Sequence, residues 1–307
     1  MALVRFICTF VSALLLITSN IFTGYIANQV FQIQSNELFF PTKREQQRFK
    51  WQPKNVSEQP PPLPPRAATI YLITSTRPHN TQKLDLTSLC QTLMHVPDLV
   101  WIVVEASTVK SKSVGKVLER CQVPSIHLNV PEHSNLIEQR NAGLNFLTTE
   151  FCNVERCHGV VCFGNEGTKY DLRLFSEIRK TEGVSVFTAA FSSGMLVEGP
   201  LCKEGTVDTW LTINSSVPRA FPVSTLGLAV HTQLLLQHPS IQYGMTHEGS
   251  WVEENLVETT FLETLGLTQD RLECRSDNKE VLVWNTASEE PVVSYERFQH
   301  SEPGILF

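Results

Sequence analysis

The sequence predicts an α/β fold, in which a mostly parallel sheet is flanked by helices. Short apolar runs at residues 69–74, 99–104, 125–129 and 160–163 have the length and composition of buried strands. Helical patterns separate these runs, and strands that alternate with helices at this interval form parallel sheets with right-handed crossovers. The run at 160–163 ends abruptly in small and polar residues. We therefore expect the functional site at the carboxyl edge of the sheet, beside this strand.

The remaining elements follow in order. The first strand leads into a helix over 83–94, whose apolar face carries Leu86, Leu89, Cys90 and Leu93. Further helices are expected over 113–120, 138–147 and 170–180, and a further strand over 184–188. Residues 195–230 are irregular and strand-rich, a later helix carries the stripe Val257, Phe261 and Leu265, and a last strand covers 281–284. The polar tail from about residue 285 is expected to wrap loosely or to lie between subunits.

The amino-terminal segment is long and apolar enough to cross a bilayer. No charged residue occurs from Phe6 to about Ile26. A cleaved signal peptide is the alternative, but the apolar run is longer than a signal peptide requires, which favours an uncleaved anchor. Arg5 on its short side predicts a cytoplasmic amino terminus. We expect a cytoplasmic tail at 1–5, a transmembrane signal-anchor at 6–27, a proline-rich stem at 28–66, a globular domain at 67–287 and a tail at 288–307.

Charge and cysteine content restrict the partners and the compartment. The net charge of −6 and the pI near 5.9 argue against a nucleic-acid partner. Asn55 and Asn214 begin glycosylation sequons, which would be modified in a lumenal domain. Eight cysteines leave the pairing open, with Cys152 and Cys157 the best candidate pair and a zinc site disfavoured by the spacing. Cys162 is expected to be a buried, unreactive strand residue.

Several segments together resemble the β-1,3-glucuronosyltransferases. They occur in the order found in that family, between about residues 68 and 287, and comprise Thr69-Ile-Tyr, Thr74-Ser-Thr76, Gln91-Thr-Leu93, Trp101-Ile-Val-Val-Glu105, Glu138-Gln-Arg-Asn141, Gly183-Val-Ser-Val186, Glu198-Gly-Pro200, Phe221-Pro-Val223 with Gly227, and Val281-Leu-Val-Trp-Asn-Thr286. The resemblance implies that 67–287 is a GT-A glycosyltransferase domain of a Golgi type II membrane protein, that it forms homodimers and that it uses Mn²⁺. It also implies transfer of glucuronic acid from UDP-glucuronate to a galactose-terminated glycan.

The resemblance also implies roles for five residues. Glu253 matches the glutamate that deprotonates the acceptor hydroxyl in an inverting displacement. Thr76, Arg140 and Arg219 match positions at the UDP-sugar donor, where a guanidinium is a bidentate partner for phosphate or carboxylate. Glu198 matches an acceptor-binding glutamate. The alternative readings are an acidic residue that favours a helix amino terminus for Glu253, an exposed helix charge for Arg140 and a solvated turn residue for Glu198.

The departures from the family pattern concern both substrates. The metal-binding aspartate triplet is replaced by Asn165, Glu166 and Gly167, so that Glu166 is the one carboxylate left for a metal that prefers oxygen anions. Other family contacts fall on Ala106, Asn135, Ser224, Asn285 and Ala287.

Two hypotheses follow from this mixture. The first is a glucuronosyltransferase with a weakened or metal-independent donor site, in which Arg140, Arg219 and Lys169 take part of the role of the metal. The second is a catalytically impaired relative that binds a glycan or serves as a partner subunit.

Overall fold

The structure is a computed structural model that describes residues 68–152, 157–192, 194–212, 218–246, 248–275 and 280–289. All of them belong to one compact unit, residues 39–307. The predicted anchor, the stem and both sequons, at Asn55 and Asn214, lie outside the described residues. Within the described ranges, no helix has the length and apolar character needed to cross a membrane.

A seven-stranded sheet forms the centre of the domain, and its order is β11-β6-β10-β4-β1-β2-β3. Its strands are β1 Thr69–Thr76, β2 Leu99–Ala106, β3 Ser125–Val130, β4 Gly159–Asn165, β6 Val184–Val186, β10 Leu228–His231 and β11 Leu272–Cys274. Strands β4, β1, β2 and β3 run parallel, and β10 is antiparallel to both of its neighbours. The predicted α/β class with a mostly parallel sheet is therefore confirmed.

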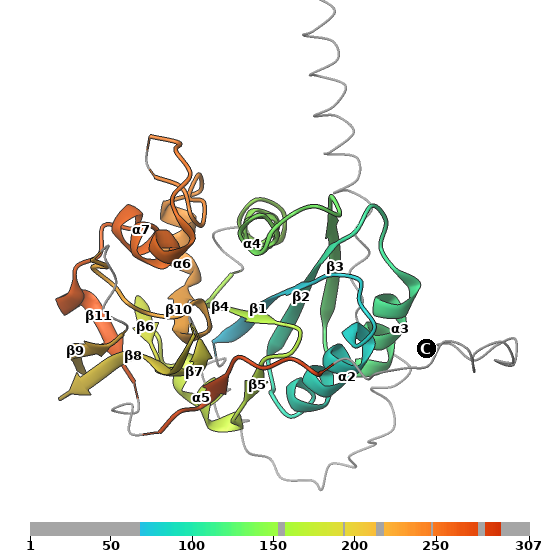
Figure 1. Cartoon of the computed structure of the whole chain (residues 1–307), viewed down its shortest axis with the longest axis horizontal. Helices are drawn as coiled ribbons and strands as arrows, with labels where there is room; N and C mark the ends of the chain where they lie inside the picture. Colours follow the sequence, from blue (N-terminus) through green and yellow to red (C-terminus); the bar gives the residue numbers. More distant parts are fainter. Residues whose placement is uncertain are drawn as a thin grey trace, which may run out of the picture. The chain divides into compact units, whose positions relative to one another are not determined.

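Helices cover both faces of this sheet (Figure 1). On one face, α2 Gln82–Leu93 and α3 Lys112–Cys121 pack in an apolar cluster with alternate residues of β1 and β2, including Leu72 and Trp101. On the other face, α4 Leu136–Asn145 and the π-helix Phe146–Phe151 pack in a second cluster. This division follows from strand geometry, because successive side chains of a strand point to opposite faces.

A second sheet, of five strands in the order β5-β12-β7-β8-β9, was not predicted as a separate unit. It consists of β5 Lys169–Tyr170, β12 Val283–Trp284, β7 Ala189–Ser192, β8 Met195–Lys203 and β9 Thr206–Leu211. Short helices complete the domain: α5 Leu172–Ile178, α6 Thr232–Gln237 and α7 Val257–Thr264, with 3-10 turns at Thr225–Gly227, Glu254–Leu256 and Gln269–Arg271. Strand β12 lies within the strand expected over 281–284, whereas the two-residue β5 is too short for a periodicity to be read from the sequence.

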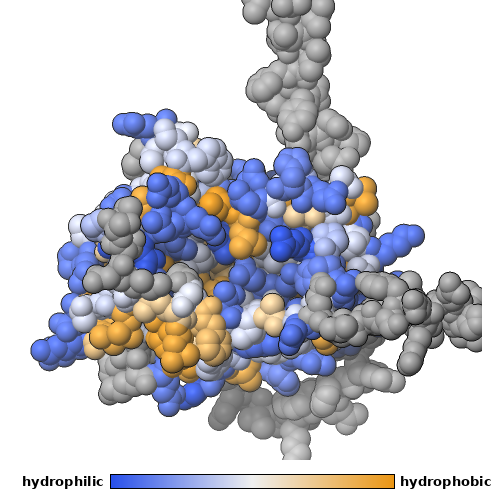
Figure 2. Space-filling model, viewed as in Figure 1, coloured by the Kyte–Doolittle hydropathy of each residue, from blue (hydrophilic) through white to orange (hydrophobic). Residues whose placement is uncertain are grey.

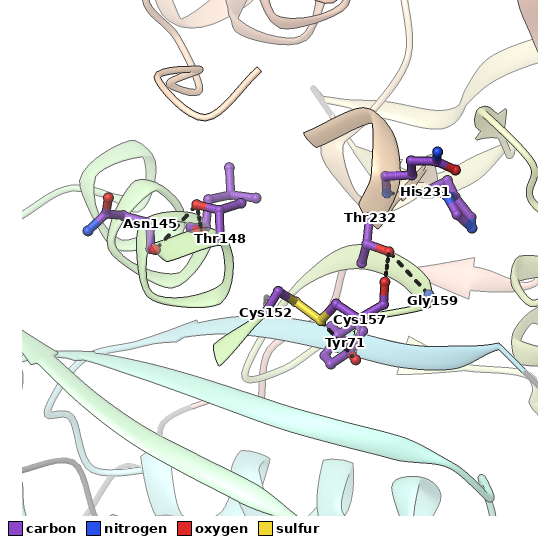
Figure 3. Close-up of a disulfide and its surroundings, with 10 residues drawn as sticks. Tyr71, Asn145, Thr148, Cys152, Cys157, Gly159, His231 and Thr232 are labelled. Atoms are coloured by element: carbon purple, nitrogen blue, oxygen red, sulfur yellow. Dashed lines mark hydrogen bonds between the residues drawn. A yellow bond between two sulfur atoms is a disulfide. The ribbon is translucent and has the colours of Figure 1, made fainter. Parts of the chain in front are cut away.

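Three disulfides are formed among the described cysteines. Cys152–Cys157 confirms the predicted pair and lies beside Tyr71 and Thr232 (Figure 3). Cys90–Cys121 joins α2 to α3, and Cys202–Cys274 joins β8 to β11. Cys162 is a free thiol buried in β4, and burial raises its pKa to about 12, which agrees with the predicted unreactive strand residue. Disulfides of this density are typical of proteins from oxidising compartments.

Candidate active site

A cleft of about 860 Å³ opens at the carboxyl edge of the main sheet, between α4 and the segment that leads into α7. Figure 1 shows α4 and α7 on the same side of the sheet. The polar residues that line the cleft are Asn135, Arg140, Asn165, Ser192, Arg219, Ser224, Thr225, Glu254, Asn255, Glu258 and Asn285. The cleft therefore includes the end of β4, where the sequence predicted a site.

Arg140 is a buried cation in this cleft, with an exposed fraction of 7%. Its guanidinium stands 5.7 Å from the centroid of the Tyr243 ring and donates one long hydrogen bond, 3.5 Å, to Asn165 Oδ1. Its Nε is buried and has no hydrogen-bond partner. Among the described residues, no carboxylate lies within 4.0 Å of it. A buried guanidinium with unused donors fits an anionic ligand such as a diphosphate.

Glu258 is a carboxylate of the cleft that the sequence did not reveal. It accepts a hydrogen bond from Thr225 Oγ1, which in turn accepts one from the Tyr243 hydroxyl at 3.0 Å. Burial raises the pKa of Glu258, although the Thr225 hydrogen bond and the charge of Arg140 oppose this shift. A carboxyl with a raised pKa in a cleft is a candidate for a functional group. The only sequence signal was its position, one residue after Val257 of the apolar stripe.

The raised pKa of Glu258 has a consequence for stability. Because the folded chain disfavours the carboxylate, Glu258 should lower stability increasingly as the pH rises above about 4.3, the ordinary value for glutamate. We expect the Tm difference between Glu258→Gln and the unaltered chain to grow in favour of the variant between about pH 5 and pH 8. The exposed Glu263 of α7 provides the control, since Glu263→Gln makes the same replacement outside the cleft. A difference for Glu258→Gln that does not vary with pH would contradict this account.

Arg219 and Glu198 form an ion pair at one side of the cleft. Arg219 lines the cleft, and its guanidinium lies 2.5 Å from the carboxylate of the fully buried Glu198. Strand β8, which carries Glu198, requires the glycine after it, because Gly199 has a φ of +139° and a Cβ there would stand 2.8 Å from Thr188 Cα. Glu198 therefore orients Arg219 in this structure, while the guanidinium reaches the cleft.

Glu253 is exposed at the rim of the cleft. It immediately precedes the 3-10 turn Glu254–Leu256, and its neighbours Val252 and Glu254 line the cleft. A carboxylate in this position is solvated and accessible to a hydroxyl that enters from outside. Arg140 and Arg219 thus line the same cleft, and Glu253 stands in sequence between two of its lining residues.

Thr76 and Glu166 lie away from the cleft lining, in a polar network at the end of β1. Glu166 accepts a hydrogen bond from Thr76 Oγ1 and is 2.6 Å from His79 Nε2. Gln82 donates to Thr76 Oγ1 at 2.9 Å. Burial raises the pKa of Glu166, partly offset by its hydrogen bonds from Thr76 and His79. The carboxylate predicted as the remaining metal ligand is therefore already satisfied by protein donors, and His79 was not anticipated as its partner.

The segment 285–288 runs directly over Gly167, the last residue of the triplet that replaces the aspartates. It is visible as the red trace that follows the second sheet toward α2 (Figure 1). A Cβ on Gly167 would stand 2.1 Å from the Thr286 carbonyl oxygen. Thr286 Oγ1 donates to the Gly167 carbonyl at 2.8 Å, and Ser288 Oγ donates to the buried Asp85 at 2.6 Å. The expectation of a loosely wrapped tail is wrong for these residues, because hydrogen bonds attach them to the domain.

These contacts test the Mn²⁺ that the resemblance implies. Hard divalent cations need several oxygen ligands, and carboxylates are the usual anionic ones. In the parts of the chain that the structure describes, no group of three His, Cys, Asp or Glu side chains is arranged to hold a metal. Glycine leaves room here for the backbone of the segment 285–288 rather than for a ligand. The residues present do not fit the metal.

Introducing a side chain at Gly167 should consequently destabilise the fold. We expect Gly167→Asp to lower the free energy of unfolding by about 1–3 kcal/mol, since overpacking against a backbone atom forces the chain to shift. Thermal unfolding should show a Tm lower by several degrees, whereas Asn165→Asp, at a half-exposed position, should change it little. An unchanged Tm for Gly167→Asp would mean that the segment 285–288 does not lie against this glycine.

Other replaced positions have acquired structural roles. Asn135 is the N-cap of α4 and forms a capping box with Glu138. Ser224 accepts a hydrogen bond from Ser192 at 2.8 Å, and Asn165 donates to Asn285 at 3.4 Å. Polar side chains that satisfy one another thus occupy positions that the resemblance assigned to substrate contacts.

Comparison with known proteins agrees with the resemblance. The family model "Glycosyltransferase family 43" matches residues 89–289. The chain is 35% identical over 251 residues to galactosylgalactosylxylosylprotein 3-beta-glucuronosyltransferase 2 of Canis lupus familiaris, covering 78% of this chain and 74% of that protein. It is 33% identical over 243 residues to galactosylgalactosylxylosylprotein 3-beta-glucuronosyltransferase sqv-8 of Caenorhabditis elegans, covering 74% of this chain and 66% of that protein.

A solved structure of S. aureus TarS in complex with UDP-GlcNAc is also similar, with a TM-score of 0.47 and 14% sequence identity, over 73% of this chain and 60% of that one. The family assignment rests on the sequence matches, which cover most of the described domain. The chain belongs to glycosyltransferase family 43, as a divergent member.

Proposed function

We propose that the chain is an inverting transferase that moves glucuronic acid from UDP-glucuronate to a terminal galactose of a glycan. The observation that carries the proposal is Arg140, a buried guanidinium with an unpartnered Nε in a cleft large enough for a nucleotide sugar. The relatives are named as 3-beta-glucuronosyltransferases, which supports this donor and acceptor. The cleft at the carboxyl edge of a mostly parallel sheet is also consistent with the proposed GT-A arrangement.

The residues predicted for the site have separate roles in this reaction. Arg140 binds the diphosphate and stabilises the negative charge that develops on the departing UDP. Arg219, oriented by Glu198, pairs with the carboxylate of the glucuronate. Glu253 removes the proton of the acceptor hydroxyl as its oxygen attacks the anomeric carbon, and the bond to UDP breaks on the opposite side. Thr76 contributes indirectly, by holding the end of β1 through Glu166 and Gln82.

The proposed reaction does not use a divalent metal. The Glu166 carboxylate is already hydrogen-bonded to Thr76 and His79, and Gly167 has no side chain that could be a ligand. Arg140 and Arg219 line the cleft and supply the positive charge. Leaving-group stabilisation by fixed cations is an accepted alternative to a metal ion.

A second candidate function is supported by the self-satisfied contacts at Asn135, Ser224 and Asn285. These contacts favour a chain that binds a glycan or a partner transferase without catalysing transfer. Both candidate functions place a ligand in the cleft, and they differ in whether the chain catalyses transfer.

One experiment separates the two functions. The full chain, purified in detergent, is supplied with UDP-glucuronate and a galactose-terminated acceptor in the presence of EDTA, and glucuronide formation is measured by mass spectrometry. We expect product with EDTA present. Binding of UDP in calorimetry without any product, with EDTA or with added Mn²⁺, would support the non-catalytic function instead. Absence of UDP binding would reject the transferase.

The assembly and location are also proposed. A Golgi type II membrane protein and a homodimer are the arrangement that the resemblance implies. Support for a dimer comes from exposed apolar residues of the second sheet, Phe191, Leu196 and Leu201, with exposed fractions of 49%, 73% and 39%. Figure 2 shows an apolar patch over the same part of the domain, around β7 to β9. Light scattering should give twice the monomer mass, and a monomer mass would reject the dimer.

A further inference from the structure

A groove of about 540 Å³ runs between α2 and α3, on the face of the main sheet opposite α4. Its floor includes Val117 and Cys90, which is bonded to Cys121. Both helices begin at the carboxyl edges of the strands before them, so the groove starts at the same edge of the sheet as the cleft. The groove lies on the other face and shares no lining residue with the cleft.

The lining of this groove is basic. Its charged residues are Lys83, Lys112, Lys116 and Arg120, and no acidic side chain lines it, although the whole chain has a net charge of −6. Lys112, Lys116 and Arg120 recur every four residues of α3, which places them on one face of the helix. All three are exposed, and among the described residues none has a carboxylate within 4.0 Å.

The row of cations on α3 lowers the stability of the helix in the absence of a ligand. Like charges four residues apart on a helix destabilise it, whereas scattered surface charges do not. A row of cations in a groove concentrates positive potential and attracts a polyanion. The charge pattern therefore favours a binding surface over ordinary solvated lysines.

The groove is also held rigidly. The Cys90–Cys121 disulfide joins α2 and α3 near their carboxyl ends. At its other end, α3 is capped by Ser111, whose backbone N–H donates to the buried Glu105 at 2.9 Å. Fixed spacing between the two walls lowers the entropy that binding must overcome.

The wall opposite the cations indicates which kind of polyanion fits. Thr87 and Gln91 lie four residues apart on α2. The Thr87 hydroxyl donates to the Lys83 carbonyl at 2.6 Å and can still accept a hydrogen bond, and the Gln91 amide can donate and accept. The row from Lys112 to Arg120 extends over about 12 Å, since a helix rises 1.5 Å per residue. A groove of this length suits a linear chain, whereas the flat surface of an anionic bilayer would meet only its rims. Sulfate and carboxylate groups on a sugar chain match the cations, and its hydroxyls match the opposite wall.

We propose that the groove between α2 and α3 is a second glycan site, which binds a sulfated or carboxylated polysaccharide independently of the cleft. Its role would be to hold an acidic glycan chain on the protein while the cleft acts on a separate terminal sugar. The proposal does not require that the chain catalyses transfer.

The test measures binding of heparin oligosaccharides to the full chain by surface plasmon resonance at several salt concentrations. The groove variant carries Lys112→Gln, Lys116→Gln and Arg120→Gln. The control carries Lys180→Gln, Lys203→Gln and Arg271→Gln, which removes the same charge from exposed positions outside the groove. We expect the groove variant to bind at least about tenfold more weakly, and the control to stay within about twofold of the unaltered chain.

The salt dependence gives a second readout. The slope of log affinity against log salt reports the number of counterions released on binding. In the groove variant the magnitude of this slope should fall by at most about three, and in the control by much less. Equal losses in both variants would overturn the proposal, as would binding to phosphatidylserine vesicles without binding to the oligosaccharide. No binding of the unaltered chain at about 0.15 M salt would also overturn it. UDP binding should be unchanged in the groove variant, so that this result is independent of the cleft.

Discussion

Replacement of Arg140 by alanine is expected to weaken UDP binding in the cleft at least about tenfold. Arg140 is 7% exposed, its Nε has no partner, and its guanidinium donates a single long hydrogen bond, to Asn165 Oδ1. Each charge-assisted hydrogen bond to a phosphate contributes about 1.5–3 kcal/mol, so loss of one such bond should weaken UDP binding by roughly tenfold to 150-fold. Isothermal calorimetry with UDP measures the change directly.

The matched control for this prediction is Arg140→Lys. Lysine keeps the charge but loses the planar fork, so we expect it to recover part of the affinity and not all of it. The ring of Tyr243, 5.7 Å away, remains in place for either cation. Equal UDP affinity for Arg140→Ala and the unaltered chain would show that the nucleotide does not enter this cleft, and the proposed transferase would have to be abandoned.

Replacement of Glu253 by glutamine is expected to abolish transfer while leaving UDP binding unchanged. A general base contributes about 10²–10⁴-fold to the rate, and glutamine keeps the shape of the side chain without its proton-accepting charge. Glu253 is exposed at the rim, so the replacement should not alter the fold or the Tm. The rate of glucuronide formation and the calorimetric affinity for UDP are measured on the same preparation.

Two neighbouring carboxylates serve as controls. Glu254 lines the cleft one residue further on, and Glu258 lies inside it. If Glu254→Gln lost the rate and Glu253→Gln kept it, the register on which the catalytic role of Glu253 rests would be wrong by one residue. A loss with Glu258→Gln alone would transfer the proposed base to the buried carboxyl, whose raised pKa would then appear in the pH profile of the reaction.

The predicted order of strands and helices agrees with the structure through the first half of the domain. The expected helix over 83–94 is observed as α2, Gln82–Leu93, and the expected strand over 99–104 as β2, Leu99–Ala106. The helix buries one apolar stripe, and the strand buries both of its faces. Burial of either kind leaves a recognisable apolar pattern in the sequence. The strand expected over 281–284 is observed as β12, Val283–Trp284, but its pairing with the two-residue β5 in a second sheet left no such pattern, because the two strands are brought together by the chain around them.

The site was predictable in part. Residue type and register predicted roles for Arg140, Arg219 and Glu253, and the structure places the first two in the lining of one cleft, with Glu253 next to its lining residue Glu254. The partnership of Glu166 with His79 and the packing of the segment 285–288 over Gly167 were not predictable. Both join positions more than eighty residues apart, and no local pattern encodes the distance between them.

The sequence by itself determined the α/β class, the family and the loss of two of the three acidic residues at the end of β4. Those conclusions depend on periodicity and residue identity, which are local properties of the chain. Only the tertiary structure decided what the loss means. Gly167 makes room for the Thr286 carbonyl, Thr76 and His79 satisfy Glu166, and Arg140 remains as a buried cation with unused donors. Whether a polar group is free or satisfied depends on residues brought close by folding, which residue identity alone does not specify.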